Sequence, residues 1–485
     1  MKTVVKHVRK LRLRKLVLSC VTLLTLLSCT LCFAAERPNI VLIMADDLGY
    51  GDTGFTGHKM IKTPHLDQMA ADGVQMTNFH AGGPVCSPTR GTFVTGRHYY
   101  RYGINTANRG HLPKQEITVS EILKENGYAT GHFGKWHLGT LSETMSAKGA
   151  KRKPKENFSP PSWHGYDEWF VTESAVQTWD PAEGKRSRNN PFWDNGIAMD
   201  PKDPSLKGSA SRVVMDRAIP FIQQAVEKKQ PFLSVIWFHA PHEDVAAGPV
   251  SHKYYTDQGV DENTAHYYGC ITELDTEIGR LRAELKRLGV ADNTLITFTS
   301  DNGPEGKVAK GRKAGTTDGL RGRKRSLYEG GVRVPTLALW PGQIKPGTEI
   351  QAPASTLDYF PTVAAIVNYT MPDERPIDGT SLLPLFSGQS KVDRPAIPFR
   401  YGKQVALIDG DYKLVAKYHN LEGGLLELYN IKTDRTETKD ISAGQPERVE
   451  FMRKKLKVFM KSAKKSHAGG DYNDKAFKPV RKWSN

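Results

Sequence analysis

The sequence predicts an α/β fold in which a mostly parallel β-sheet is sandwiched between helices. Short apolar runs recur up to residue 340, and they are followed by polar or glycine-rich turns and helical patterns. This alternation is typical of parallel sheets, because two parallel strands need a crossover connection between them. The runs predicted as strands are 39–45, 74–79, 128–133, 232–238, 295–299 and 334–340.

Helices are predicted between several of these strands. Thr63, Pro64 and Gly73 provide the cap, the first-turn proline and the terminal glycine of one helix. Residues 119–126 form another, which ends at a glycine. A long helical pattern over 266–289 has one apolar face.

The pattern changes after about Pro384. Short strand-like pieces follow, and then a helical segment near 446–462, which predicts a small α+β subdomain with a short antiparallel sheet. A chain of 485 residues is too long for one small core, so more than one domain is expected. The predicted parts are a signal peptide at 1–34, a catalytic domain at 35–384, and a C-terminal subdomain with a basic tail at 385–485. Residues 142–211, rich in Lys, Pro and Trp, are expected to form a long surface excursion.

The N-terminus has the layout of a secretory signal. A basic region precedes an apolar stretch from Leu16 to Phe33 and a small-residue exit, so we expect cleavage near Ala34. A retained anchor helix is the alternative, because the apolar run is long. No other apolar run could cross a membrane, and a periplasmic, cell-surface or extracellular location is expected.

Positive charge dominates the chain. Seven Lys and Arg and no acidic residue precede Leu16, so cleavage would lower the formal net charge from +16 to +9. An exported basic protein suits polyanionic partners such as sulfated or carboxylated glycans. The basic segment 453–482 is interpreted as a solvated helix face and tail rather than a binding surface.

Acidic side chains follow two of the predicted strands. Asp46 and Asp47 come directly after the first, and Asp301 and Asn302 follow the strand at 295–299. Ligands of open α/β sheets bind at the carboxyl ends of strands, so we expect these side chains to converge. Oxygen ligands favour calcium or magnesium over zinc. Either pair alone would be common turn chemistry, but the two together favour a metal site.

Basic side chains follow two other predicted strands. Lys135 and His137 come after the third strand, and His239 and His242 come after the fourth. Such residues supply positive charge for the oxygens of an anionic ester and a proton for its leaving group. The structural alternatives are a tight turn with a buried tryptophan for the stretch GKWHLG and a pair of packed histidines for the stretch HAPH. Lys324, after a glycine-rich loop, is a further candidate anion ligand.

Cysteine is scarce outside the predicted signal segment. Only Cys86 and Cys270 remain there, too few for a disulfide framework. Cys270 lies on the predicted helix at 266–289 and is expected in the core. Cys86, in the stretch PVCSPTRG, lies where a loop meets the start of a helix, with Pro88 and Arg90 just after it.

The stretch CSPTRG matches the CxPxR core that marks the sulfatase family of the alkaline phosphatase superfamily. Five further stretches resemble motifs of that family and occur in the family's order between about Pro38 and Pro335: IVLIMADDLGYGD, TGHFGKWHLG, APH, SDNGPEG and LRGRKRSLYEGGVRVP. A single CxPxR would be a chance-level pattern, but six ordered motifs are specific. The resemblance implies an alkaline-phosphatase-like fold and hydrolysis of sulfate monoesters.

The resemblance also implies the chemistry of Cys86. In that family a maturation enzyme oxidises the motif cysteine to formylglycine. The hydrated aldehyde is the nucleophile, and it forms a covalent sulfo-enzyme intermediate. The family's metal is one calcium ion per chain, and the ligands implied here are Asp46, Asp47, Asp301, Asn302 and the modified Cys86.

Further roles carry over by motif. Arg90 would hold the hydrate, and His137 would hydrogen-bond to it. The residues implied to contact the sulfate are Lys135, His242 and Lys324, the last two near the leaving oxygen. His242 is chosen over His239 because the family's histidine follows Ala-Pro. The sequence departs from the family pattern at two positions: Asp244 replaces a frequent proline, and Arg323 replaces a frequent glycine.

The substrate is less defined by the sequence. Export and basic charge favour sulfated carbohydrates over small aryl sulfates. The excursion at 142–211 offers aromatic faces for a sugar, or else a small satellite core, through Trp163, Trp169, Trp179 and Trp193. One alternative is a phosphoesterase or phosphonate hydrolase of the same superfamily, and another is a non-catalytic polyanion-binding protein. We expect no nucleic-acid partner and no integral membrane segment after cleavage.

Overall fold

The computed structural model describes residues 37–483. The predicted signal peptide and its cleavage point therefore lie outside the described residues. Within the described part, no helix has the length and apolar character needed to cross a membrane.

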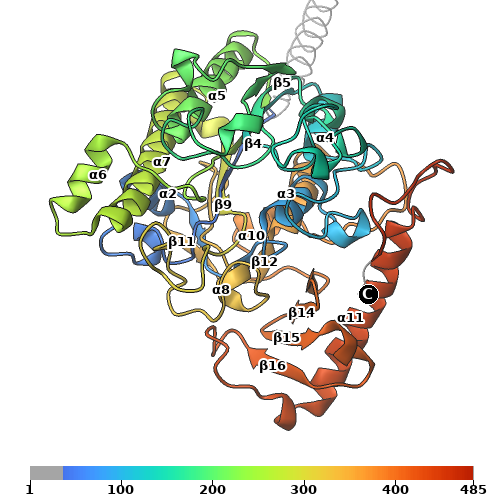
Figure 1. Cartoon of the computed structure of the whole chain (residues 1–485). Coiled ribbons are helices and arrows are strands. Elements are labelled where there is room, and N and C mark those ends of the chain that lie inside the picture. Colours follow the sequence, from blue (N-terminus) through green and yellow to red (C-terminus); the bar gives the residue numbers. More distant parts are fainter. Residues whose placement is uncertain (1–36, 484–485) are drawn as a thin grey trace, which may run out of the picture. The chain divides into compact units, whose positions relative to one another are not determined.

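A ten-stranded sheet forms the centre of the fold (Figure 1), in the order β11-β2-β10-β9-β1-β8-β4-β5-β6-β7. The five strands from β9 to β5 run parallel, and β10 pairs antiparallel with β9. The strands are β1 (Asn39–Ala45), β2 (Val74–Met76), β4 (Ala129–Lys135), β5 (Glu168–Thr172), β6 (Trp193–Asp194), β7 (Ile197–Ala198), β8 (Phe232–Trp237), β9 (Thr294–Ser300), β10 (Leu337–Leu339) and β11 (Thr348–Ile350). A separate short pair joins β3 (Phe79–His80) to β12 (Ala354–Ser355). The predicted mostly parallel sheet is confirmed.

Both faces of the sheet are buried. Alternate side chains of β1 enter two different cores, Ile40 and Leu42 on one face and Val41 and Ile43 on the other, as the period of two in a strand requires. Helices cover each face (Figure 1). One core includes side chains of α3 (Cys86–Thr95), α4 (Val119–Glu125) and α9 (Tyr359–Ile366). The other includes side chains of α2 (Pro64–Asp72), α5 (Ala210–Glu227) and α7 (Glu262–Arg287). The remaining short helices are α6 (Pro249–Thr256), α8 (Glu329–Val332) and α10 (Leu383–Phe386).

The C-terminal part is the predicted α+β element. Four antiparallel strands follow one another as β13 (Ile397–Tyr401), β14 (Gln404–Asp409), β15 (Tyr412–Lys417) and β16 (Leu426–Asn430). The long helix α11 (Pro446–His467) buries Met452 and Leu456 against this sheet. Its basic residues Lys464 and Lys465 are exposed. The domain boundary expected after residue 384 stays a prediction.

The region 142–211 differs from the expected surface excursion. It contains β5, which pairs in parallel with β4, and β6 and β7, which extend the central sheet. Trp169 of β5 is therefore a core side chain, 5% exposed, and not a sugar-binding surface. Trp163 is 36% exposed, and Lys114 Nζ lies 3.6 Å from its ring centroid. The apolar run of β5 is only a few residues long and lies between polar segments, so it was not recognised as a strand in the sequence.

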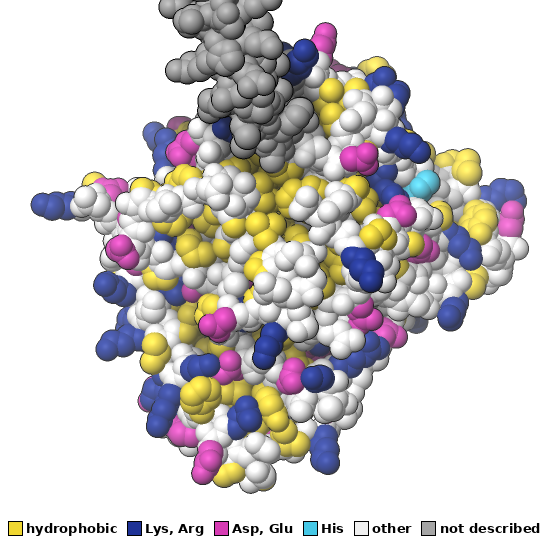
Figure 2. All heavy atoms as spheres, turned by 180° about the vertical axis from the view of Figure 1, so that it is seen from behind, with side chains coloured by type: hydrophobic (Ala, Val, Ile, Leu, Met, Phe, Trp, Pro, Cys, Tyr) yellow, Lys and Arg dark blue, Asp and Glu magenta, His cyan; other side chains and the backbone are white. Residues whose placement is uncertain are grey.

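The surface shown in Figure 2 is not uniformly basic, although the chain has a net positive charge. On the side turned away in Figure 1, basic and acidic side chains are interspersed (Figure 2). Because neighbouring charges of opposite sign offset one another, a surface of this kind has no large field of a single sign.

Candidate active site

The predicted site residues converge at the carboxyl ends of four neighbouring strands. β9, β1, β8 and β4 are adjacent in the sheet, and the chain leaves them through Asp301, Asp46, Phe238 and Trp136. Crossover connections bring these strands together, although the paired residues Asn39 of β1 and Thr294 of β9 are 255 positions apart in the sequence. The site therefore has the position that open parallel sheets favour for ligands.

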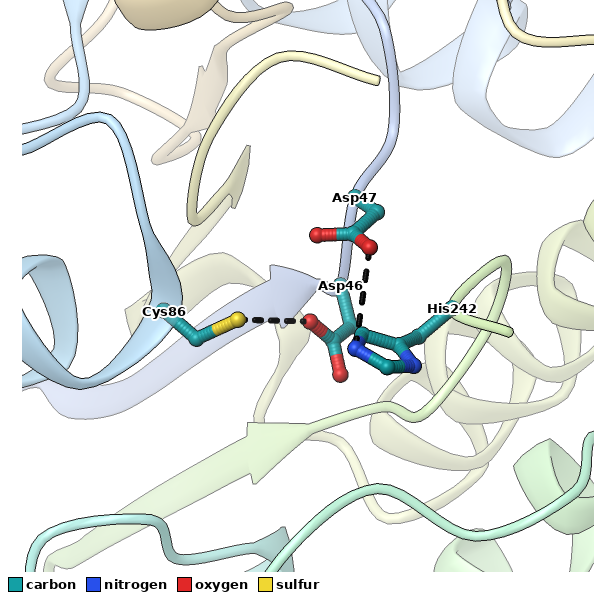
Figure 3. A group of neighbouring side chains, drawn as sticks. All are labelled: Asp46, Asp47, Cys86 and His242. Atoms are coloured by element: carbon teal, nitrogen blue, oxygen red, sulfur yellow. Dashed lines mark hydrogen bonds and ion pairs between the residues drawn. The ribbon is translucent and has the colours of Figure 1, made fainter. Parts of the chain in front are cut away.

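Cys86 is the first residue of α3 and is 1% exposed. Its Sγ points at Asp46 and lies 3.5 Å from Oδ1 (Figure 3). Burial, together with the negative charge of Asp301, raises the pKa of the Cys86 thiol. Since the thiolate is the reactive form of cysteine, the unmodified side chain is a poor nucleophile at neutral pH.

Arg90 lies one turn after Cys86 on the same helix face and is completely buried. Its Nε and Nη2 donate to Asp301 Oδ2 at 3.1 and 2.8 Å, and Nη1 donates to the Lys135 carbonyl at 3.3 Å. These bonds join α3 to the ends of β9 and β4. Arg90 thereby fixes where the first turn of α3 lies relative to the sheet.

Four oxygen-bearing side chains form the centre of the site. Asp47 N donates to Asp301 Oδ1 at 3.1 Å, and Asn302 Nδ2 donates to Asp47 Oδ1 at 2.7 Å. Asn302 Oδ1 is buried and has no hydrogen-bond partner among the described residues. Burial and the nearby charge of Asp46 raise the pKa of Asp301 to about 6. Three carboxylates and a free amide oxygen fit a hard cation such as calcium.

One ligand atom each from Asp46, Asp47, Cys86 and His242 also lies within 4.8 Å of the other three (Figure 3). All four side chains thus face a common centre.

Two lysines flank the acidic centre. Lys135 Nζ lies 2.6 Å from Asp46 Oδ2, and Lys324 Nζ lies 2.5 and 2.7 Å from the two oxygens of Asp47. Although burial opposes it, the charge of Asp47 raises the pKa of Lys324. Lys324 is therefore a cation at neutral pH, and both lysines are placed to bind the oxygens of an anionic ester. Arg323, at the position where the family frequently has glycine, donates from its guanidinium to the carbonyls of Glu305, Gly306 and Gly315.

The structure distinguishes the two candidate histidines after β8. His242 Nε2 lies 3.7 Å from Asp47 Oδ2, and its Nδ1 donates to the Glu243 carbonyl at 2.5 Å. Burial lowers the pKa of His242 to about 3, although the charge of Asp47 opposes this. His239 is completely buried, and neither ring nitrogen has a hydrogen-bond partner among the described residues. His242 is thus the histidine that contacts the acidic centre.

His137 is held by a residue that the sequence did not reveal. Its Nε2 lies 2.8 Å from Asn108 Oδ1, and its backbone N donates to the Glu173 carbonyl at 3.1 Å. Its Nδ1 is buried and has no hydrogen-bond partner among the described residues. Burial, with the charges of Lys135 and Arg90, lowers the pKa of His137, so the ring is neutral.

Backbone strain marks the same residues. Asp47, Asn108 and His137 have φ of 66°, 59° and 60°, in the left-handed region. Non-glycine residues in this region are uncommon, and such strain gathers at functional sites. Asn108 lies in a loop before Gly110 and belongs to none of the six motifs, so the sequence did not predict its role.

The fold and the site together are those of a hydrolase of anionic esters. The Sulfatase family model matches residues 38–369, and the model for the N-sulphoglucosamine sulphohydrolase C-terminal region matches residues 322–466. Human arylsulfatase A is 35% identical over 378 residues, covering 75% of this chain and 71% of that protein. N-acetylgalactosamine-6-sulfatase from Canis lupus familiaris is 31% identical over 399 residues, covering 78% and 72%.

Among solved structures, that of Ps i-CgsB in complex with k-i-k-neocarrahexaose superimposes with a TM-score of 0.76 at 27% identity, covering 91% of this chain and 96% of that one. The chain belongs to the sulfatase family. It is a sulfuric ester hydrolase, with the alkaline-phosphatase-like fold that its motifs predicted.

Proposed function

We propose that this protein hydrolyses sulfate monoesters on sulfated carbohydrates, using a hydrated formylglycine made from Cys86 and one calcium ion. The observation that carries the proposal is the placement of Cys86. Its Sγ lies against Asp46 at the first turn of a helix, and the other carboxylate oxygen of Asp46 accepts from the buried Lys135. An unmodified thiol with a raised pKa would be inactive there, so modification gives this position its chemistry.

Calcium would be held by Asp46, Asp47, Asp301, Asn302 and the modified side chain of residue 86, and it would supply positive charge to the sulfate oxygens. Support comes from the free oxygen of Asn302 and from the raised pKa of Asp301, which burial and the nearby charge of Asp46 cause. Zinc is less suited, since oxygen atoms outnumber nitrogen and sulfur among these side chains.

The remaining roles follow from position. Lys135 and Lys324 would donate to the sulfate oxygens, on which negative charge must be stabilised. His137, neutral and held by Asn108, would accept a proton from the hydrate through Nδ1. Arg90 would hold the hydrate while it ties α3 to the sheet.

Two groups could protonate the leaving oxygen. His242 Nε2 carries a lone pair, because Nδ1–H donates to Glu243. An anionic substrate would raise its pKa, which lets it carry a proton. Lys324 is already protonated and is the second candidate donor.

The substrate class is supported by relatives and by charge. One similar protein is named for N-acetylgalactosamine 6-sulfate, and one similar structure contains a neocarrahexaose. We further propose that residues 1–34 direct export and that a formylglycine-generating or equivalent enzyme matures Cys86.

Mass spectrometry of the peptide that contains Cys86, from protein made in its native host, tests the proposal. We expect the mass of the aldehyde or its hydrate, and an unmodified thiol would contradict the mechanism. Turnover of p-nitrophenyl sulfate and p-nitrophenyl phosphate then separates the activities. Faster phosphate release would favour the phosphoesterase alternative, and an unmodified Cys86 with no release of either product would favour a polyanion-binding protein.

A further inference from the structure

A groove of about 610 Å³ opens beside the acidic centre. It is lined by residues of the loop 305–313 together with Lys324 and Arg325. Because Lys324 also contacts both carboxylate oxygens of Asp47, the groove begins where the reacting sulfate would be bound. Its volume lies in the range of pockets that bind small ligands.

Positive charge dominates this groove. Glu305 is the single acidic residue among those that line it. The five basic residues that line it are Lys307, Lys310, Lys313, Lys324 and Arg325. Glu305 is already engaged, since its two oxygens accept from Arg325 at 2.8 and 3.0 Å. Lys307 and Lys310 are exposed and take part in none of the ion pairs found among the described residues. These two ammonium groups are therefore available to a ligand.

The loop that carries the lysines is anchored at its base. Arg323 donates to the carbonyls of Glu305, Gly306 and Gly315, and Arg312 Nη1 donates to the Val245 carbonyl at 2.5 Å. Within the loop, Lys310 and Lys313 exchange backbone hydrogen bonds at 3.1 and 3.0 Å. Arginine side chains thus hold the backbone of the loop, while the side chains of Lys307 and Lys310 remain for the groove.

We propose that this groove is an anion subsite for a sulfated oligosaccharide. The reacting sulfate lies at Lys324, and the groove binds a second anionic group of the same molecule, either a carboxylate or a sulfate. The inference rests on the proposed function and adds that the substrate carries at least two anionic groups. A small aryl or steryl sulfate has one anionic group and would leave Lys307 and Lys310 without a partner. An oligosaccharide with anions on neighbouring sugars would engage both ends of the groove.

Binding of two matched probes tests the subsite. N-acetylgalactosamine 6-sulfate carries one anionic group, and a chondroitin 6-sulfate tetrasaccharide carries the same sulfate beside carboxylates. Affinities are measured by calorimetry with calcium present, in a Cys86→Ala background that turns over neither probe. The Lys307→Ala/Lys310→Ala double variant is compared with Lys464→Ala/Lys465→Ala, which removes the same charge from the exposed face of α11.

We expect the unchanged groove to prefer the tetrasaccharide. The groove variant should reduce the ratio of the two affinities about threefold to thirtyfold, because each exposed ion pair contributes modestly, and the α11 variant should keep the ratio. The preference should also shrink between about 0.05 and about 0.5 M salt, since screening weakens exposed charges. Equal affinity for both probes, or an unaltered ratio in the groove variant, would overturn the proposal.

Failure of the proposed function has a different signature. It would appear as no sulfate release from either probe by protein that retains Cys86 and has been matured in its host. The binding ratio does not depend on that result, so the subsite and the catalytic proposal are tested separately.

Discussion

The hydrogen bond between His137 and Asn108 gives a sharp test of how the site is positioned. Asn108 has φ of 59°, so Asn108→Gly removes the side chain without forcing a new residue into the left-handed region. The change leaves the buried Nε2–H of His137 without its acceptor. An unsatisfied buried donor costs about 1–3 kcal/mol, and the same loss in the transition state lowers kcat/KM about fivefold to 150-fold.

The assay is kcat/KM for p-nitrophenyl sulfate as a function of pH. Asn108→Asp serves as a second variant, because its carboxylate would favour the charged imidazolium and raise the pKa of His137. If neutral His137 accepts the proton, the acidic limb of the profile moves to higher pH. Asn368→Gly is the matched control, an exposed asparagine with φ of 53° outside the site. A glycine variant at 108 with kcat/KM equal to that of the control would refute the positioning role.

Three further outcomes are expected. Removing calcium with a chelator should abolish sulfate release and lower the Tm, because the carboxylates near Asp46 then repel one another; a Tm that calcium does not restore would speak against the site. Gly134→Ala should lower the free energy of unfolding in urea by at least about 2 kcal/mol, because φ is +104° and the added Cβ would lie 2.0 Å from the Trp237 carbonyl oxygen. Gly149→Ala is the control, since Gly149 also has a positive φ but lies in open space, and it should lower this free energy by about 1 kcal/mol. Glu273→Gln tests a partly buried acid whose pKa is raised by desolvation to about 7. The folded protein then holds a proton that the unfolded chain loses above about pH 4.5, so the free energy of unfolding falls between about pH 4.5 and 7 by up to about 1.4 kcal/mol per unit. The glutamine variant should lose this part of the slope, and an equal slope in both proteins would contradict the raised pKa.

Much of the architecture was legible in the sequence because its signals are local. Buried parallel strands need continuous apolar runs, so the predicted strand at 39–45 coincides with β1. The cap and stop at Thr63 and Gly73 likewise bound α2. β5 was missed because its five residues lie inside a polar, tryptophan-rich region. The signal of such a strand is its pairing with β4, which is not a local property.

The features of the candidate site also fall into those that the sequence predicts and those that depend on contacts in the folded chain. The sequence alone determined which groups follow each strand, the CSPTRG motif that singles out Cys86, and the family to which the motifs point, since these depend on residue type and order. The folded arrangement was needed to show that His242, which the motif had already favoured, contacts Asp47, that Asn108 holds His137, and that the exposed lysines at 307 and 310 continue the pocket of Lys324. These features are contacts between segments that crossover connections bring together, and a contact of that kind leaves no periodicity or spacing in the chain.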